Sequence, residues 1–363
     1  MQSPERIAEA LLAGGVAEGV FSGAQAAWCK GPDRRLEGAS AGATKTAGGA
    51  PIDRGTLFDV ASLTKLFTAA AVLRLAERGE LAFGAELGER LPELRGTPQS
   101  RATLEQVLAH EAGFTPWSPL FESVPDGLRG TASGMAPLLA AMARCAPASS
   151  PDGVARYSDL GFIALGVWVE RAVGASLDEV IAAEVTAPLG LSSALFRPST
   201  ADASRLSAAA FAATSTRSWR GGEIVGEVHD DNAWAAGGVA GHAGLFAAAE
   251  DVARLGAAWL DALGGEGSWL SRDTAAAAAH RRPSGRGLGF DFVSAEGSSA
   301  GALMGRDGFG HLGFTGCSLW IDPELGCAIA LSTNRVLMGE DLAAIKAFRP
   351  RFHDGVMRAL LGG

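Results

Sequence analysis

Segments typical of β-strands lie near both ends of this chain of 363 residues, and this distribution limits the folds that the chain can adopt. Strand patterns occur at 22–41 and again, punctuated by glycine, at 287–333. Between 81 and 283, helix-like segments are joined by loops that contain Pro and Gly. This order predicts a mixed α/β (α+β) fold. An antiparallel sheet flanked by helices is built from both chain ends, and an all-helical lobe is inserted between them.

The same pattern divides the chain into two lobes. We expect residues 1–80 to form the first part of an α/β lobe, 81–283 a helical lobe, and 284–363 the rest of the α/β lobe. Two lobes also fit the length, because a single hydrophobic core seldom grows beyond about 250–300 residues. A cleft between lobes is a common place for a small-molecule site.

The composition is that of an ordinary globular protein, with 47% hydrophobic and 20% charged residues. The net charge of −9 and the lack of a basic run argue against nucleic acid as a partner, because binding phosphates needs clustered Lys and Arg. The longest apolar run, 160–169, is shorter than the ~20 residues that span a bilayer, so we expect no membrane span. The sequence does not indicate an oligomeric state.

Cysteine spacing and the N-terminus bear on metal binding and location. The cysteines are too far apart for a Cys-x-x-Cys metal site, and we expect free, buried thiols. They are Cys29, Cys145, Cys317 and Cys327. His229, Asp230 and His242 offer ligand atoms but lack helical spacing and a clear third ligand, so we expect no metal. Residues 1–10 contain no secretory signal, which favours a cytoplasmic protein, with a processed exported form as the alternative.

One motif carries residues suited to covalent chemistry. Ser62 and Lys65 form the single Ser-x-x-Lys of the chain, at the start of a buried helix predicted over 62–78, which Gly79 ends. Residues three apart share a helix face, so the Lys65 amine can reach the Ser62 hydroxyl. The helix start favours a developing negative charge on Ser62. Partial burial would lower the pKa of Lys65 and let it act as a general base.

Two rare residues follow this motif in the chain. Tyr157 is the only tyrosine, and it stands just before the apolar run 160–169. His311 lies in a predicted edge strand within 308–316, where glycines let a ligand approach closely. Taken alone, each has a structural explanation, because a half-buried tyrosine commonly packs with its hydroxyl satisfied and a lone histidine is more often structural.

The order of the three motifs points to a known family. Ser-x-x-Lys at 62–65 is followed by Tyr-Ser-Asp at 157–159 and His-Leu-Gly at 311–313. The chain resembles the serine beta-lactamase and penicillin-binding-protein-like superfamily, and in particular its class C-like branch. The resemblance spans about 57–334, and the runs 108–113 and 237–246 support it. It implies a beta-lactamase/transpeptidase-like fold.

The resemblance also implies catalytic roles. Ser62 would be the nucleophile, and Lys65 and Tyr157 would share proton transfer. The backbone N–H groups of Ser62 and Phe314 would form the oxyanion hole. Catalysis would proceed through an acyl-enzyme, without a cofactor.

The implied substrate-binding residues are Asp159, His311, Gly313 and Phe314, and two of them depart from the family pattern. Asp159 replaces the usual asparagine, so an amide that donates becomes a carboxylate that only accepts, which weakens binding of an acylamino side chain. His311 replaces the lysine common in true beta-lactamases, which removes a fixed positive charge for a substrate carboxylate. We therefore expect weak beta-lactamase activity at most. The class A motif Glu-x-x-x-Asn is absent, which excludes class A deacylation.

The sequence thus predicts a serine hydrolase that acts on an ester or a D-amino-acid-type amide, as an esterase or D-peptidase. Its partner would be a small molecule or short peptide. An acyltransferase using the same acyl-enzyme and a non-catalytic ligand-binding homologue remain as alternatives. Two Gly-x-Ser-x-Gly matches, at 38–42 and 297–301, are set aside because no helix follows them. Trp117 and Phe121 either line the pocket or pack in the core.

Overall fold

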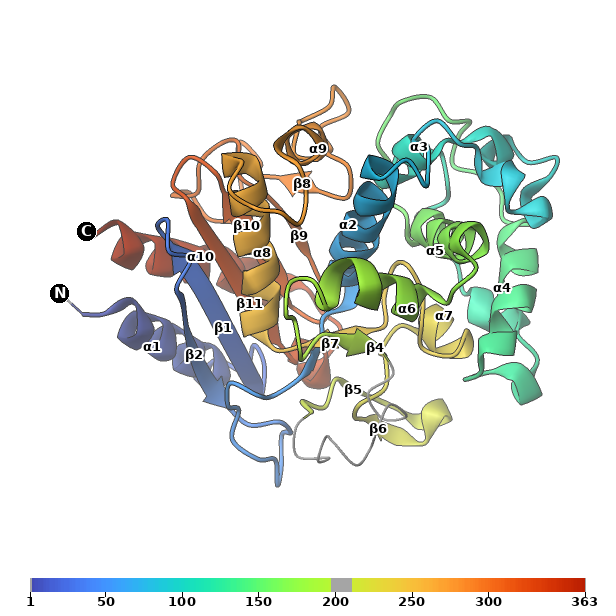
Figure 1. Ribbon diagram of the computed structural model, residues 1–363. Coiled ribbons are helices and arrows are strands. Elements are labelled where there is room, and N and C mark those ends of the chain that lie inside the picture. Colours follow the sequence, from blue (N-terminus) through green and yellow to red (C-terminus); the bar gives the residue numbers. More distant parts are fainter. Residues whose placement is uncertain (1, 197–210, 363) are drawn as a thin grey trace.

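The computed structural model describes residues 2–196 and 211–362, and its largest sheet has six antiparallel strands (Figure 1). The strand order is β2-β1-β11-β10-β9-β8. β1 (Gly23–Lys30) and β2 (Leu36–Gly42) come from the N-terminal part, and β1 pairs directly with β11 (Cys327–Thr333). The others are β8 (Asp291–Phe292), β9 (Phe309–Leu312) and β10 (Ser318–Asp322). The sheet is built from both chain ends, so the predicted fold class is confirmed.

Helices cover both faces of this sheet. Because side chains alternate along each strand, its longer strands contribute to the cores on both faces. Trp28 of β1 points into a core covered by α1 (Pro4–Ala17) and α10 (Ala343–Leu361). Its neighbour Ala27 belongs to the core on the opposite face. There α8 (Ala249–Gly264) packs on β1, β10 and β11 (Figure 1). The sheet is therefore the middle layer between two layers of helix.

The position of α8 differs from the prediction, which placed residues 250–263 in the helical lobe. One side of α8 is apolar, and Leu255 and Trp259 are buried there. Gly256 lies against the sheet, where an added Cβ would be 2.7 Å from the Cβ of Ala328 in β11. The helix comes this close because glycine has no side chain. The amphipathic pattern predicted the helix but not the surface on which it packs.

The remaining helices lie mostly beside the sheet, with α2 nearest to it (Figure 1). The longer ones are α2 (Thr64–Glu77), α4 (Met135–Met142) and α5 (Asp159–Val173). The shorter ones are α3 (Leu104–Leu108), α6 (Leu177–Ile181), α7 (Asp231–Ala235) and α9 (Arg272–Ala278). α9 packs on α8 rather than on the other short helices.

Two small sheets also occur, and four of their five strands lie in 81–283, where the sequence predicted only helices. One contains β3 (Phe58–Asp59), β7 (Leu245–Ala247) and β4 (Leu195–Phe196), and the other β5 (Ser215–Arg217) and β6 (Gly222–Ile224). Strands of two or three residues are too short to show an alternating pattern. The middle of the chain is therefore predominantly helical, not all-helical.

α2 is buried along most of its length and carries the predicted nucleophile at its start. A 3-10 turn (Ala61–Leu63) precedes it, so Ser62 stands at the helix start as predicted. Gly79 follows the helix with a φ of 74°. Polar side chains of α2 bind distant segments, and Thr68 Oγ1 donates to Gly241 O at 2.9 Å. α2 therefore fixes the helical part of the molecule relative to the nucleophile.

The four cysteines are free, as predicted. Cys29, Cys317 and Cys327 are also buried as predicted, whereas Cys145 is only half-buried. Within the ranges given above, no single helix is both long and apolar enough to cross a membrane. One sharply bent pair, α5 with Leu177–Thr186, reaches that length and composition together.

We expect Gly256→Leu to destabilise the protein by about 1–3 kcal/mol, because its side chain must enter a packed helix–sheet interface. The matched control is Gly264→Leu at the exposed end of α8, for which we expect a change within about 0.5 kcal/mol. Chemical denaturation followed by circular dichroism gives both values. Equal stabilities of the two variants would contradict the packing of α8 on β11.

Candidate active site

An unusual turn presents Ser62 at the start of α2. Ala61 has a φ of 48°, in the left-handed region that residues other than glycine seldom occupy. The Asp59 carboxyl group holds this turn by accepting a hydrogen bond from the Ala61 N–H at 2.8 Å. Its other oxygen accepts from the His229 N–H at 2.7 Å, and burial raises the pKa of Asp59 to about 6. A buried carboxyl group therefore supports the backbone that carries Ser62.

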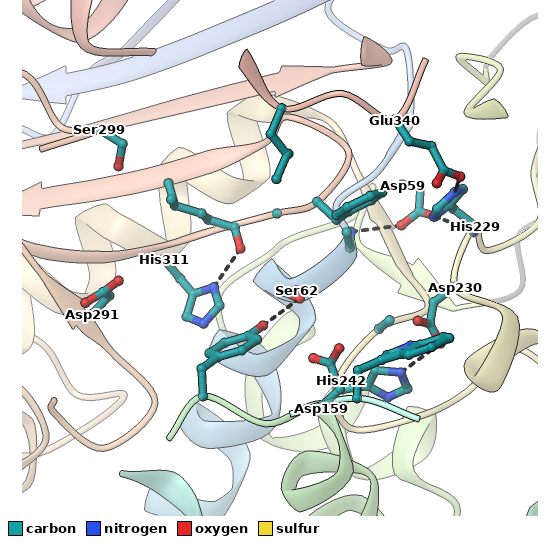
Figure 2. A pocket seen from close by; sticks show the side chains of 18 of the residues that line it. Asp59, Ser62, Asp159, His229, Asp230, His242, Asp291, Ser299, His311 and Glu340 are labelled. Atoms are coloured by element: carbon teal, nitrogen blue, oxygen red, sulfur yellow. Dashed lines mark hydrogen bonds and ion pairs between the residues drawn. The ribbon is translucent and has the colours of Figure 1, made fainter. Parts of the chain in front are cut away.

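Ser62, labelled in Figure 2, contacts through Oγ both groups that the sequence predicted for proton transfer. Lys65 Nζ donates to it at 3.0 Å and the Tyr157 hydroxyl at 2.9 Å. The Tyr157 ring packs against that of His110, with centroids 4.7 Å apart. His110 Nδ1 also accepts from the Ser158 N–H at 3.1 Å, which fixes the segment leading into α5. The structure thus brings the three predicted residues together.

Lys65 is fully buried and makes two further hydrogen bonds. Its Nζ donates to Asp159 Oδ1 at 2.7 Å and to His242 O at 3.2 Å. Burial acts to lower the pKa of Lys65, but the Asp159 charge and the Tyr157 contact outweigh it and raise the pKa. The predicted lowering is wrong, because the sequence did not reveal a carboxylate against this amine. Lys65 therefore rests as an ammonium ion.

Tyr157 and Asp159 complete the resting arrangement. Burial raises the pKa of Tyr157, although the Lys65 charge opposes the shift, so the hydroxyl rests as a neutral phenol. Asp159 is the first residue of α5, and its side chain is 18% exposed and lines the pocket. One carboxylate oxygen binds Lys65, and the side chain still faces the space where a ligand would bind.

His311 lies on β9, near the Tyr157 ring at a centroid distance of 5.8 Å. Burial, followed by the Lys65 charge, lowers the pKa of His311 to about 3. Its Nδ1 lies 2.8 Å from Leu312 O, a contact that a neutral ring makes by donating from Nδ1. His311 therefore brings no positive charge to the pocket at neutral pH.

Gly313 and Phe314 follow β9. An added Cβ at Gly313 would lie 2.5 Å from Val60 O, so this position lets the end of β9 meet the segment before Ser62. The N–H of Phe314 donates to no other residue in the described part of the chain. Its side chain is 40% exposed and stacks on His229 with centroids 5.5 Å apart. The Phe314 amide is thus free for the oxyanion that the sequence prediction gave it.

A buried arginine that the sequence prediction missed holds this turn. Arg349 of α10 donates to the carbonyl oxygens of Gly313 at 2.7 Å, Cys317 at 2.8 Å and Gly316 at 3.1 Å. Burial lowers the pKa of Arg349 to about 10, which leaves the guanidinium protonated at neutral pH. No local motif marks it, because the contact depends on how α10 packs against the sheet.

Two more side chains hold the other carbonyls of the turn. Arg335 Nε donates to Phe314 O and Thr333 Oγ1 donates to Thr315 O, each at 2.8 Å. Every carbonyl group from 313 to 317 therefore accepts a hydrogen bond from a side chain. Amides held rigidly in this way stabilise a developing negative oxygen without first having to reorganise.

A pocket of about 1160 Å³ opens over Ser62 and has room for a drug-sized molecule or a short peptide. Tyr157 and His311 line it beside the serine. Trp117 and Phe121, for which pocket and core were both open, also line it, and Trp117 is 50% exposed. Ser62 thus lies in a cleft with an aromatic wall.

The histidines and aspartate weighed as metal ligands form a different arrangement. His242 Nε2 lies 2.8 Å from Asp230 Oδ1, and the backbone oxygen of His242 accepts from Lys65. Across residues 2–196 and 211–362, no group of three or more His, Cys, Asp or Glu side chains is placed to hold a metal ion. The Asp230–His242 contact instead anchors the loop that binds the Lys65 ammonium.

Comparison with known proteins agrees with this geometry. The beta-lactamase family model matches residues 8–349. The protein belongs to the beta-lactamase family. The resemblance to this family predicted from three short motifs is confirmed, and this beta-lactamase-family protein is a serine hydrolase.

Its similar relatives include two proteins named "Putative D-alanyl-D-alanine carboxypeptidase". The one from Salmonella agona (strain SL483) is 28% identical over 305 residues, and the one from Salmonella typhi is 27% identical over 304 residues. Each comparison covers 77% of this chain and 69% of the relative. The beta-lactamase-family protein thus shares most of its length with both relatives.

Solved structures resemble the beta-lactamase-family protein over nearly its whole length. The D-amino acid amidase from Ochrobactrum anthropi SV3, complexed with D-phenylalanine, has a TM-score of 0.76 and 18% identity and covers 99% of both chains. EstCE1, described as "a hydrolase with promiscuous acyltransferase activity", has a TM-score of 0.74 and 20% identity over 98% of this chain and 99% of its own. At these identities the likeness establishes the fold alone.

We expect Arg349→Met to slow the reaction of the protein with a fluorophosphonate roughly ten- to hundred-fold. Loss of the Arg349 guanidinium loosens the turn at 313–317 and so weakens the Phe314 amide as an oxyanion donor. Complete removal of such a donor typically lowers the reaction rate by about 100- to 1,000-fold. The matched control is Arg351→Met, two residues along α10, whose guanidinium is partly exposed and pairs with Glu18. Labelling rates come from intact-mass time courses. A slower reaction in both variants, or in neither, would contradict a specific effect on the turn.

Proposed function

We propose that this serine hydrolase forms an acyl-enzyme on Ser62 and acts on an ester or a D-amino-acid-type amide. The observation that carries the proposal is the contact of Ser62 Oγ with both Lys65 Nζ, at 3.0 Å, and the Tyr157 hydroxyl, at 2.9 Å, inside the pocket. Covalent acyl transfer needs a nucleophile, a group that takes its proton and donors for the oxyanion. The geometry of one pocket supports all three.

The proton of Ser62 passes to the Lys65–Tyr157 pair as Oγ bonds to the substrate carbonyl carbon. Because Lys65 rests as an ammonium and Tyr157 as a phenol, the pair must first lose one proton. The amine or phenolate that results accepts the Ser62 proton. The pair then protonates the departing alcohol or amine, so the acyl-enzyme forms with its protons balanced.

The carbonyl oxygen of the substrate becomes negatively charged during this attack. The N–H groups of Phe314 and Ser62 would receive it, each donor typically contributing about 3–4 kcal/mol to transition-state stabilisation. Deacylation repeats the steps in reverse, with water in place of the departing group. The same pair then takes a proton from water and returns one to Ser62.

The substrate class follows from the pocket and from similar proteins. The neutral His311 offers no cation for a substrate carboxylate, which supports weak beta-lactamase activity at most. The structural relatives named as an amidase of D-amino acids and as a hydrolase fit an amide or ester substrate. The curated relatives named as carboxypeptidases fit a D-peptide.

Acyl transfer to an amine or alcohol is the second candidate. Likeness to EstCE1, whose description includes promiscuous acyltransferase activity, favours it. Product analysis of a p-nitrophenyl ester reaction with added alcohol separates the two, because a transferase yields the new ester and a strict hydrolase yields only the acid. A non-catalytic ligand-binding role fits less well, because the contacts of Lys65 and Tyr157 with Ser62 are intact.

We expect intact-mass spectrometry to detect one covalent adduct with a fluorophosphonate or a penicillin on the native protein and none on Ser62→Ala. The matched control is Ser299→Ala, which removes the serine of the Gly-x-Ser-x-Gly match at 297–301 and also lines the pocket. This variant should keep the adduct. No adduct with a broad panel of both reagents, or an adduct that survives in Ser62→Ala, would overturn the proposal.

We expect kcat/KM for a p-nitrophenyl ester to rise with pH, because only the pair that has lost one proton accepts the Ser62 proton. Asp159→Asn removes the charge that raises the pKa of Lys65, so the acidic limb should move to lower pH by roughly 1–3 units. Asp291→Asn, which changes another carboxylate of the pocket, should leave the limb in place. An unmoved limb in Asp159→Asn would show that Asp159 does not control this proton.

A further inference from the structure

We propose that Asp159 selects acyl donors with a free ammonium group on the carbon next to the scissile carbonyl. This inference rests on the function proposed above and narrows its substrate class. It separates substrates such as amino-acid amides, esters and peptides with a free N-terminus from their N-acylated counterparts.

Asp159 lies close to the reacting atoms. A single ammonium group, that of Lys65, contacts both Ser62 Oγ at 3.0 Å and Asp159 Oδ1 at 2.7 Å. Asp159 is therefore separated from the attacking oxygen by one nitrogen atom. The substituent on the α-carbon of an acyl group lies two bonds from the carbon under attack. It thus falls within reach of the carboxylate.

The Asp159 carboxylate keeps hydrogen-bonding capacity for a ligand. Among the described residues, Lys65 is the one that donates to this side chain, and it uses Oδ1. The side chain is 18% exposed and lines the pocket, so Oδ2 stays open to a ligand. An ionised carboxylate only accepts hydrogen bonds and binds a charged N–H donor most strongly. The carbonyl oxygen of an N-acyl group would meet a like partial charge there.

A second carboxylate lies on the same side of Ser62 as Asp159. Figure 2 shows Asp159 and Asp230 on one side of Ser62 and Asp291 on the other. Burial acts to raise the pKa of Asp230, but the charge of His242 outweighs burial and lowers this pKa, so the carboxylate stays ionised. His242 Nε2 lies 2.8 Å from Asp230 Oδ1, and Lys65 binds one oxygen of Asp159. Of these two carboxylates, Asp159 is therefore the one beside Ser62 that keeps an oxygen for a substrate ammonium.

Two other groups in the pocket fit the same substrate. Trp117 is half exposed and lines the pocket, and an aromatic face attracts a cation. The guanidinium of Arg286 lies 5.8 Å from the centre of the Tyr157 ring and pairs with Asp291 at 3.4 Å. The positive charge of Arg286 is thus paired with Asp291, which lies on the opposite side of Ser62 from Asp230 (Figure 2).

The test compares D-alanine p-nitroanilide with N-acetyl-D-alanine p-nitroanilide. We expect kcat/KM for the free amine to exceed that for the N-acetyl compound at least about ten-fold at a pH below the amine pKa, near 8, and the preference to fade above it. Asp159→Asn should reduce the ratio about ten-fold, and Asp291→Asn should leave it unchanged. A ratio near one in the native protein, or an equal ratio in Asp159→Asn, would overturn the inference. Using a ratio cancels any effect of Asp159 on the proton of Lys65.

Binding gives a readout that does not depend on turnover. In Ser62→Ala, calorimetry should find D-alaninamide bound about ten-fold more tightly than N-acetyl-D-alaninamide, and the added Asp159→Asn change should remove the difference. p-Nitrophenyl acetate, which has no amine, tests the proposed function by itself. If Ser62 hydrolyses this ester but the protein does not prefer the free-amine anilide to the N-acetyl anilide, only the selection by Asp159 is overturned. Lack of turnover with a retained binding preference overturns only the proposed hydrolysis.

Discussion

The active site depends on the hydrogen bonds that satisfy the buried ammonium group of Lys65. An unpaired ammonium so far from water would cost several kcal/mol, so it must find acceptors wherever the fold places it. Its acceptors, Ser62 Oγ, Asp159 Oδ1 and His242 O, come from three separate segments. Satisfying one charge therefore fixes the starts of α2 and α5 and the loop before β7 relative to one another. The same contacts decide which protons the site holds at rest.

A different set of buried groups holds the Ser62 and Phe314 amides, which we propose as oxyanion donors. Asp59 holds the turn at Ala61, and two arginines and a threonine hold the turn after β9. The two turns meet where Gly313 lies against Val60 O. Side chains that need not touch a substrate thus set the geometry of the backbone amides that would bind the substrate oxygen.

The sequence predicted the parts of this protein that depend on local pattern. The spacing of Ser62 and Lys65 on one helix face, the helix end at Gly79 and the strands at both chain ends were all recognised. Features that arise from packing between distant segments were missed. The carboxylate of Asp159 against Lys65 reversed the expected pKa shift, α8 packed on the sheet, and Arg349 reached the oxyanion turn from the last helix. Asp159 was singled out from sequence only because it departs from a family motif.

The pairing of β1 with β11 has a consequence for how the protein is made. Ser62, Lys65 and Tyr157 leave the ribosome before the turn at 313–317, and Arg349 follows later still. A partly synthesised chain therefore carries Ser62 without the Phe314 amide and without the strand that pairs with β1. The complete arrangement around Ser62 thus forms only after β11 and Arg349 have been synthesised, and not while the helical segments fold.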